Sequence, residues 1–372
     1  MGLVVQRLRA PNGTAASFTV LGEDSLPIEP VEAYLAHLEA GGSSPNTVAG
    51  YAYDLKDFFT WMGQEHFEFR EVDLERLALF FAWLRRPRAL REPGVFMLPG
   101  TPTAMSNSTL ARKRAALAGF YRFHARRDAE IPALLGELVG PQPTGRYQPM
   151  LAHLRRSDRS AAESGSPIRI PVHRTPPAVL SDEEVATVLA ACARRRDRFL
   201  FGLLDTTGLR ISEALGLRHS DLRLRRGEIH VVHRDDNANQ ARVKGGKSRI
   251  VPADGRLLED YGCYMEEEYG SLDSDYVFVT LFRGAVGSPL TRSAVSDLVR
   301  RIRLKTGIGH FHPHALRHTY ATRLLRRRVP VEVVAELLGH SSSQTTADIY
   351  SHLSVEDHRR ILVEAGVLEA AS

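Results

Sequence analysis

The chain has 372 residues, of which 43% are hydrophobic and 25% charged, and its formal net charge at pH 7 is +5. This length gives room for two or three domains, and the composition excludes general disorder. No uninterrupted apolar stretch approaches about 18 residues, and residues 1–24 lack the apolar core of a signal peptide, so we expect a cytoplasmic protein with no membrane partner. Two cysteines, Cys192 and Cys263, are too few for a disulfide framework or a zinc site and fit a reducing compartment.

The basic balance favours a polyanionic partner such as nucleic acid, although many soluble proteins are mildly basic. Residues 1–24 are expected to form an N-terminal tail. Residues 25–135 have the pattern of a small helical bundle, with apolar residues at helical spacing in four segments. Ser44-Pro45 supplies the capping serine and first-turn proline of the second helix, and a third is expected from Asp73 to Arg86.

The fourth predicted helix carries a run of basic residues. A solvated charged face is the commoner reason for such a run, whereas contact with a phosphate backbone is the functional interpretation. We name Arg112, Lys113 and Arg114, together with Lys247 of the second predicted domain, as candidate DNA-binding residues.

Residues 136–177 are rich in proline, glycine and serine and are expected to form an interdomain linker, whose role the sequence does not reveal. Residues 178–372 form the second predicted domain, which opens with a capping box at Ser181–Glu184. Two strand-like runs, 228–233 and 247–252, are joined by a long polar connection and followed by further helices. The predicted fold class is therefore mainly α with a small antiparallel β element (α+β).

Arg210 follows the helix-ending Gly208 and stands three residues before Glu213. A carboxylate at this spacing can hold an arginine ready to bind a phosphate with both arms of its guanidinium. A structural arginine–glutamate pair is the more frequent reason for this pattern alone.

The connection between the strands contains Lys244-Gly-Gly-Lys247, after an unusually long polar stretch from Asp235 to Gln240. Such a turn is usually a solvated loop. A lysine on a glycine-rich turn can also reach a DNA groove and donate a proton, and we prefer Lys244 to Lys247 for that role.

Pro313 begins a predicted helix on which His314 and Arg317 share one face. His314 and His318 have the spacing of metal ligands, but this stretch offers no acidic or thiol companion, so we expect no metal. Further along, Gly339 ends a helix just before His340, and Tyr350 follows ten residues later. A lone tyrosine of this kind is usually structural.

Taken together and in this order, Arg, Lys, His-x-x-Arg, Leu-Gly-His and Tyr over residues 210–350 resemble the tyrosine recombinase (phage integrase) family. The resemblance covers the whole second domain. It extends more weakly to the first domain, where the Thr47-x-x-x-Tyr51-x-x-Asp54 stretch resembles the core-binding domain of the family.

The resemblance implies that Tyr350 attacks a DNA phosphodiester and forms a 3′-phosphotyrosyl link. Arg210 and Arg317 then bind the phosphate oxygens, and Glu213 holds Arg210 in place. The family pattern further implies a role in proton transfer or phosphate binding for three residues: His314 accepts the tyrosine proton, Lys244 protonates the leaving oxygen and His340 hydrogen-bonds the phosphate. No ATP, metal or other cofactor is expected.

The implied partners are double-stranded DNA with specific recombination sites and further copies of the chain, as a homo-tetramer on DNA. A helix start at Ser354–Asp357, followed by apolar residues, is expected to form an oligomerisation tail. Two other classes remain open: a catalytically inactive DNA-binding accessory protein and a type IB topoisomerase-like enzyme. The target DNA sequence is not derivable, nor is the choice between integration or excision, transposon recombination and chromosome-dimer resolution.

Overall fold

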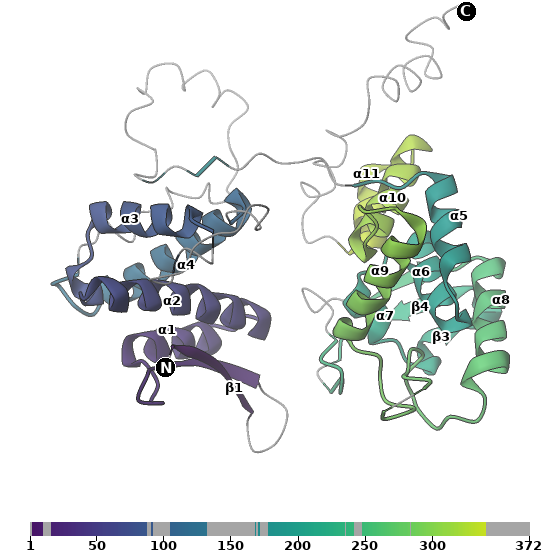
Figure 1. Ribbon diagram of the computed structural model, residues 1–372. Helices are drawn as coiled ribbons and strands as arrows, with labels where there is room; N and C mark the ends of the chain where they lie inside the picture. The colour runs from purple at the N-terminus through teal and green to yellow at the C-terminus, as the bar shows by residue number, and fades with distance from the viewer. Residues whose placement is uncertain are drawn as a thin grey trace, which may run out of the picture. The chain divides into compact units, whose positions relative to one another are not determined.

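Figure 1 shows the protein as a computed structural model, which describes residues 2–9, 16–87, 91, 105–131, 168, 170–171, 178–234, 236–241, 248–282 and 284–339. The chain divides into two compact units, Met1–Arg174 and Thr175–Ser372. No helix in these described ranges is long and apolar enough to cross a membrane.

The first unit combines an antiparallel hairpin with a helical bundle. Its elements are β1 (Val4–Arg9), β2 (Ala16–Leu21), α1 (Glu29–Ala40), α2 (Pro45–Glu65), the 3-10 turn η1 (Phe69–Glu71), α3 (Leu74–Arg85) and α4 (Asn107–Ala125). The four helices confirm the expected bundle, and Ser44 caps α2 by accepting a hydrogen bond from the Thr47 backbone nitrogen at 3.2 Å. The hairpin differs from expectation, because it occupies residues predicted to be a tail.

An aromatic core holds the bundle together. Phe58 packs edge-on against Phe80 with ring centroids 5.0 Å apart, and the Tyr121 hydroxyl donates to the Phe69 carbonyl at 3.1 Å. Ile170, from the segment predicted as a linker, is 7% exposed and belongs to this core. At this point, therefore, the expected linker packs as part of the first unit.

The second unit is a helical domain around a small antiparallel sheet in the order β3-β4-β5. Its helices are α5 (Asp182–Ala191), α6 (Arg195–Thr207), α7 (Ile211–Leu215), α8 (Gly255–Tyr264), α9 (Arg292–Thr306), α10 (Pro313–Arg326) and α11 (Val331–Leu338). Short turns are η5 (His219–Asp221), η6 (Leu224–Arg226) and the π-helical η7 (Met265–Tyr269), and the strands are β3 (Leu222–Arg223), β4 (Glu228–Val231) and β5 (Arg249–Pro252). The predicted fold class is confirmed.

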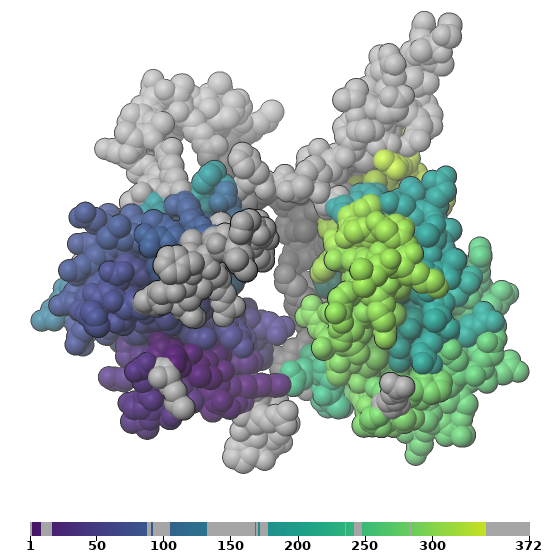
Figure 2. All heavy atoms as spheres, viewed as in Figure 1, coloured from purple at the N-terminus to yellow at the C-terminus, as the bar shows by residue number. Residues whose placement is uncertain are grey.

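Local chemistry explains where the key helices start and pack. Ser181 and Glu184 form the predicted capping box of α5, with reciprocal bonds of 3.1 and 2.9 Å. Helix α6 is buried along nearly its whole length. Helices α10 and α11 pack through a separate small cluster, and together with α9 they contribute to the surface seen in Figure 2. The members of this cluster are Ala321, Leu325, Val334 and Leu338.

Candidate active site

Arg210 lies at the junction between α6 and α7. Gly208 ends α6 with a φ of 64°, and a Cβ there would lie 2.4 Å from a Tyr320 ring carbon, so only glycine fits. Two residues later, Arg210 is the N-cap residue of α7. Its backbone nitrogen donates to Glu213 Oε2 at 2.9 Å, and its Nη1 donates to Glu213 Oε1 at 2.8 Å. The sequence spacing therefore brings these two side chains into contact as expected.

Glu213 is a buried carboxylate, 2% exposed, shared by two arginines. Arg249, the first residue of β5, donates from Nη1 to Glu213 Oε1 at 3.2 Å and from Nη2 to Oε2 at 2.7 Å. Burial by itself raises the pKa of Glu213, but the hydrogen bonds and charges of Arg249 and Arg210 outweigh it and leave that pKa below its usual value. Glu213 is therefore an anion that orients its two neighbours.

Arg317, on helix α10, lies close to the junction between α6 and α7 and is 5% exposed. Its Nη1 donates to the Gly208 carbonyl at 2.7 Å and its Nη2 to the Leu338 carbonyl at 2.8 Å. Burial, together with the positive charge of Arg210, lowers the pKa of Arg317 to about 9, so the guanidinium still carries its charge at neutral pH. An anion placed beside these like charges relieves their repulsion.

Arg210, Arg249 and Arg317, here called the arginine cluster, converge on the C-terminal end of α11. Arg249 Nε donates to the Leu337 carbonyl at 2.9 Å, and Arg210 Nη2 donates to the Gly339 carbonyl at 3.1 Å. The last carbonyls of a helix lack partners within the helix and carry partial negative charge, which explains their attraction for guanidinium groups. The chain passes directly from this cluster to His340.

His314 lies one turn before Arg317 on α10, and its side chain is exposed. Partial burial lowers the pKa of His314, and the charges of Arg317, His312 and Arg210 lower it further. The imidazole is therefore neutral near pH 7 and able to accept a proton. His318 lies on the same helix with its ring centroid 6.5 Å from that of His314. Within the described residues, no group of histidine, cysteine or acidic side chains has the arrangement of a metal site.

Four residues predicted for this site, Lys244, Lys247, His340 and Tyr350, lie outside the described residues, and their roles stay predictions. Two other contributors were missed by the sequence analysis. Arg249 has no local pattern that marks it, and His312 caps α10 by accepting the Ala315 backbone N–H at Nδ1, over 3.0 Å. The signal for His312 was its position immediately before the helix-starting Pro313.

The basic residues Arg112, Lys113 and Arg114 on α4 make contacts within the protein, whereas an exposed DNA-binding surface would leave them in solvent. Lys113 is 3% exposed, and its Nζ bonds to Asp54 at 3.0 Å and to Asp57 at 2.7 Å. Arg112 pairs with the buried Asp54, and Arg114 donates to the Ile168 carbonyl at 2.7 Å. Lys113 thus joins α4 to α2 inside the bundle. DNA contact by Arg112 and Arg114 stays a prediction.

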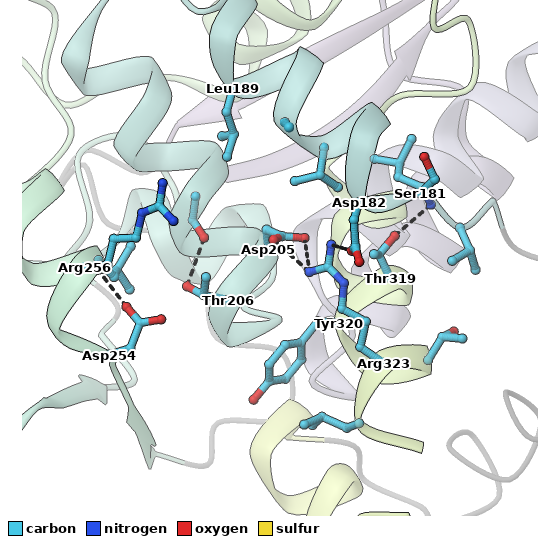
Figure 3. A pocket seen from close by; sticks show the side chains of 18 of the residues that line it. Ser181, Asp182, Leu189, Asp205, Thr206, Asp254, Arg256, Thr319, Tyr320 and Arg323 are labelled. Carbon is cyan, nitrogen blue, oxygen red and sulfur yellow. Dashed lines mark hydrogen bonds and ion pairs between the residues drawn. The ribbon is translucent and has the colours of Figure 1, made fainter. Parts of the chain in front are cut away.

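A pocket of about 1250 Å³ lies elsewhere in the second unit, among α5, α6, α8 and α10. Figure 3 shows Arg323 directed at Asp205 and Asp182, with Nη–Oδ distances of 2.8 Å to each carboxylate. No member of the arginine cluster lines this pocket. The ion pairs join α10 to α5 and α6, so this part of the domain supports the helix that carries Arg317.

Comparisons with known proteins agree with this architecture. The phage integrase family matches residues 178–357, and the phage integrase N-terminal SAM-like domain matches residues 31–128. Transposase A from transposon Tn554 of Staphylococcus aureus is 33% identical over 359 residues, which cover 95% of each chain. Tyrosine recombinase XerA of Thermococcus kodakarensis is 29% identical over 347 residues, 93% of this chain and 98% of its own.

Solved structures show the same fold. The Tn1549 transposon integrase in complex with transposon right end DNA aligns with a TM-score of 0.60 at 17% identity, covering 91% of this chain and 99% of the other. The XerH site-specific recombinase bound to a palindromic difH substrate aligns with a TM-score of 0.56 at 22% identity, covering 90% of this chain and 85% of the other.

The chain belongs to the phage integrase family. Within it, the chain is a tyrosine recombinase, an enzyme that cleaves and rejoins DNA in site-specific recombination.

Proposed function

We propose that Tyr350 is the nucleophile of this recombinase. Its hydroxyl attacks the scissile phosphodiester, forming a 3′-phosphotyrosyl bond and releasing a 5′-hydroxyl. Attack by the 5′-hydroxyl of another strand reverses the step and frees the tyrosine. Because the covalent link conserves the energy of the phosphodiester, neither ATP nor a metal takes part.

Arg210 and Arg317 bind the non-bridging oxygens of the phosphate in this proposal. The observation that carries it is their convergence at the end of α11, one residue before His340. Arg210 and Arg249 share the single carboxylate of Glu213, and Arg317 donates only to backbone carbonyls, so the three positive charges of the cluster exceed the negative charge of Glu213. This surplus suits the transition state of phosphoryl transfer, in which negative charge builds up on the phosphate oxygens.

Proton transfer is assigned to groups beside the cluster. The tyrosine hydroxyl has an ordinary pKa near 10 and needs an acceptor as it attacks. His314 supplies one: part of its side chain is exposed, and partial burial together with neighbouring positive charges lowers its pKa, so that the ring is neutral. Lys244 protonates the leaving 5′-oxygen, with Lys247 as the alternative, and His340 hydrogen-bonds the phosphate.

The proposed substrate is double-stranded DNA with specific recombination sites, bound by a homo-tetramer. We assign the reaction to the ends of a mobile element, because a relative 33% identical across nearly the whole chain is named as a transposase. Attachment-site repeats in the DNA flanking the gene are expected. We place the protein in the cytoplasm, in keeping with the free thiols of Cys192 and Cys263.

The test is covalent trapping on a nicked substrate that loses its 5′-hydroxyl fragment after cleavage. Tyr350→Phe should bind the site as tightly as the wild type and form no covalent adduct on a denaturing gel. An adduct that persists in this variant would contradict the assignment. Tyr320 would then be tested next, although burial raises its pKa and makes it a poorer nucleophile.

A further inference from the structure

Arg249 uses all three nitrogens of its guanidinium to join two parts of the active site. Nη1 and Nη2 donate to the two oxygens of Glu213 at 3.2 and 2.7 Å, and Nε donates to the Leu337 carbonyl at 2.9 Å. Its side chain is only 10% exposed. Arg249 therefore connects α7, where Arg210 is held, to the last turn of α11.

The Glu213 carboxylate accepts two hydrogen bonds from Arg210 and two from Arg249. Each oxygen accepts one bond from each arginine. If Arg249 is removed, half of these donors are lost, and the buried carboxylate is held by Arg210 alone, so the orientation of the pair is less firmly fixed. The orientation of Arg210 thus depends on a residue that belongs to a different element.

Gly339 shows how closely the guanidinium approaches the end of α11. A Cβ at Gly339 would lie 2.8 Å from Nη1 of Arg249 and 3.0 Å from its Cζ, and the glycine has a φ of 63°. The absent side chain lets the guanidinium pack against the backbone just where the chain continues to His340. The Gly339 carbonyl itself accepts from Arg210 at 3.1 Å.

We propose that Arg249 is a positioning residue: it fixes the Glu213 carboxylate against Arg210 and holds the end of α11, so that Arg210 keeps one alignment. The inference rests on the proposed role of Arg210. Arg249 acts through Glu213 and the α11 backbone, and its own charge is matched by the carboxylate it holds.

The chain offers a matched control at the opposite end of α6. Arg196 is 9% exposed, donates from Nε and Nη2 to Asp197 at 2.8 and 2.6 Å, and donates from Nη1 to the Val279 carbonyl at 2.9 Å. It therefore makes the same kinds of bond as Arg249, to one carboxylate and one backbone carbonyl. The rest of this helix, from Asp197 to Thr207, separates it from the junction at Arg210, roughly 16 Å at the α-helical rise.

The experiment compares Arg249→Gln and Arg196→Gln in the full chain. We measure the first-order rate of adduct formation at saturating nicked DNA, the dissociation constant for the site and the melting temperature. Arg249→Gln should slow adduct formation roughly 10- to 100-fold, the scale of a misaligned catalytic group, and leave the dissociation constant nearly unchanged. Arg196→Gln should lose similar thermal stability yet react at nearly the wild-type rate.

Two further variants separate positioning from general stability. Arg249→Lys keeps the charge but replaces the planar guanidinium with one ammonium, which cannot reproduce the paired bonds to Glu213 together with the bond to the Leu337 carbonyl, so it should fold and still react slowly. The double variant Arg249→Gln/Glu213→Gln should be no slower than its slower parent, since both changes remove one coupling. The proposal is overturned if the Arg249 variants slow the reaction only as much as Arg196→Gln at equal loss of melting temperature. These rates count adducts whichever residue is the nucleophile, so failure of the Tyr350 assignment is seen separately.

Discussion

His312 sets where α10 begins, two residues before His314. Its Nδ1 accepts the Ala315 backbone N–H, which requires a neutral ring with the proton on Nε2. Burial lowers the pKa of His312, and the charges of Arg303 and His310 lower it further. The helix start that presents His314 therefore depends on an unprotonated histidine.

We expect His312→Ala to lower the free energy of unfolding by about 1 kcal/mol, the usual loss for a removed cap. His312→Asn should keep the cap. In the wild type, the folded pKa of His312 is below its ordinary 6.5, so the unfolded chain binds more protons as the pH falls. The contribution of His312 to stability is full above pH 6.5 and is lost as the pH falls from 6.5 to the lowered pKa.

Urea unfolding at a series of pH values measures this effect. His312→Asn should show a shallower loss of unfolding free energy between about pH 7 and pH 5 than the wild type, because its cap does not titrate. His66→Asn is the control, since asparagine tolerates the left-handed conformation that His66 adopts at the end of α2. Equal pH slopes for the wild type and His312→Asn would contradict the prediction.

For single residues, the sequence predicts contacts between side chains that are close together in the chain. Arg210 and Glu213 lie three residues apart, and their spacing alone indicates the contact that the structure contains. Arg249 lies 36 residues from Glu213 and 88 from Leu337, so its role arises only when the chain folds. The burial of Lys113 was missed for the same reason, because its partners Asp54 and Asp57 lie on another helix.

Among the elements, the polar connection after β4 is held firmly to the domain. Asn239 Nδ2 donates to the Leu215 and Leu290 carbonyls at 2.9 and 3.0 Å, and its Oδ1 accepts from the Ala241 backbone at 3.1 Å. Ala241 is 3% exposed. Lys244 follows three residues later, so the described part of this connection fixes the point from which the lysine segment leaves.

We expect Asn239→Ala to impair the step that needs Lys244. Replacing the 5′-bridging oxygen of the DNA with sulfur gives a leaving group that departs without a proton. Asn239→Ala should slow cleavage of ordinary DNA roughly 10-fold, through misplacement of the acid, and affect the sulfur substrate much less. Lys244→Ala should show the same rescue more strongly, whereas Lys247→Ala should behave alike on both substrates.

The double variant Asn239→Ala/Lys244→Ala is the control for this coupling. It should cleave ordinary DNA no more slowly than Lys244→Ala, since the asparagine acts through the lysine. If the sulfur rescue appears with Lys247→Ala instead, the acid is Lys247. If Asn239→Ala is equally slow on both substrates, the anchoring does not serve proton donation.

The helices were predictable because their signals lie within the helix. Helix α3 was expected from Asp73 to Arg86 and runs from Leu74 to Arg85, with the Asp73 side chain accepting from the Arg76 backbone at 2.8 Å. The β1–β2 hairpin was missed because its stability comes from other elements. Leu3, Val5 and Phe18 pack on the core of the bundle, a contact that the short alternating sequence cannot reveal by itself.

On the scale of the whole molecule, each unit has its own apolar core. The first comprises the hairpin and α1 to α4, and the second comprises α5 to α11 with the small sheet. Each unit contains a segment that matches the phage integrase family. The N-terminal SAM-like domain matches residues 31–128 of the first unit, and the phage integrase family model matches residues 178–357 of the second. Because each unit has its own core, the effect of changes confined to one unit can be measured while the other stays folded.

The segment after Tyr350, which lies outside the described residues, is expected to take part in assembly. Exchange between two duplexes needs four active sites that do not all react at once. Ser354–Asp357 has the pattern of a helix start, and apolar residues follow at Ile361, Leu362, Val363, Val367 and Leu368. Resemblance to the family implies that this tail docks on a neighbouring subunit. Ending the chain after Val355 should leave binding to a single site nearly unchanged and abolish synapsis and strand exchange.

Native gel shifts and recombination assays measure both effects on the same preparations. Leu362→Asp in the full chain should reproduce the loss of synapsis, because a charged residue in an apolar contact costs several kcal/mol of association. Glu369→Ala, a polar change in the same tail, should assemble normally. Four-subunit complexes formed by the shortened chain would show that another surface couples the subunits. Loss of single-site binding would instead mean that the tail packs against its own domain, and that its removal damages the fold before assembly begins.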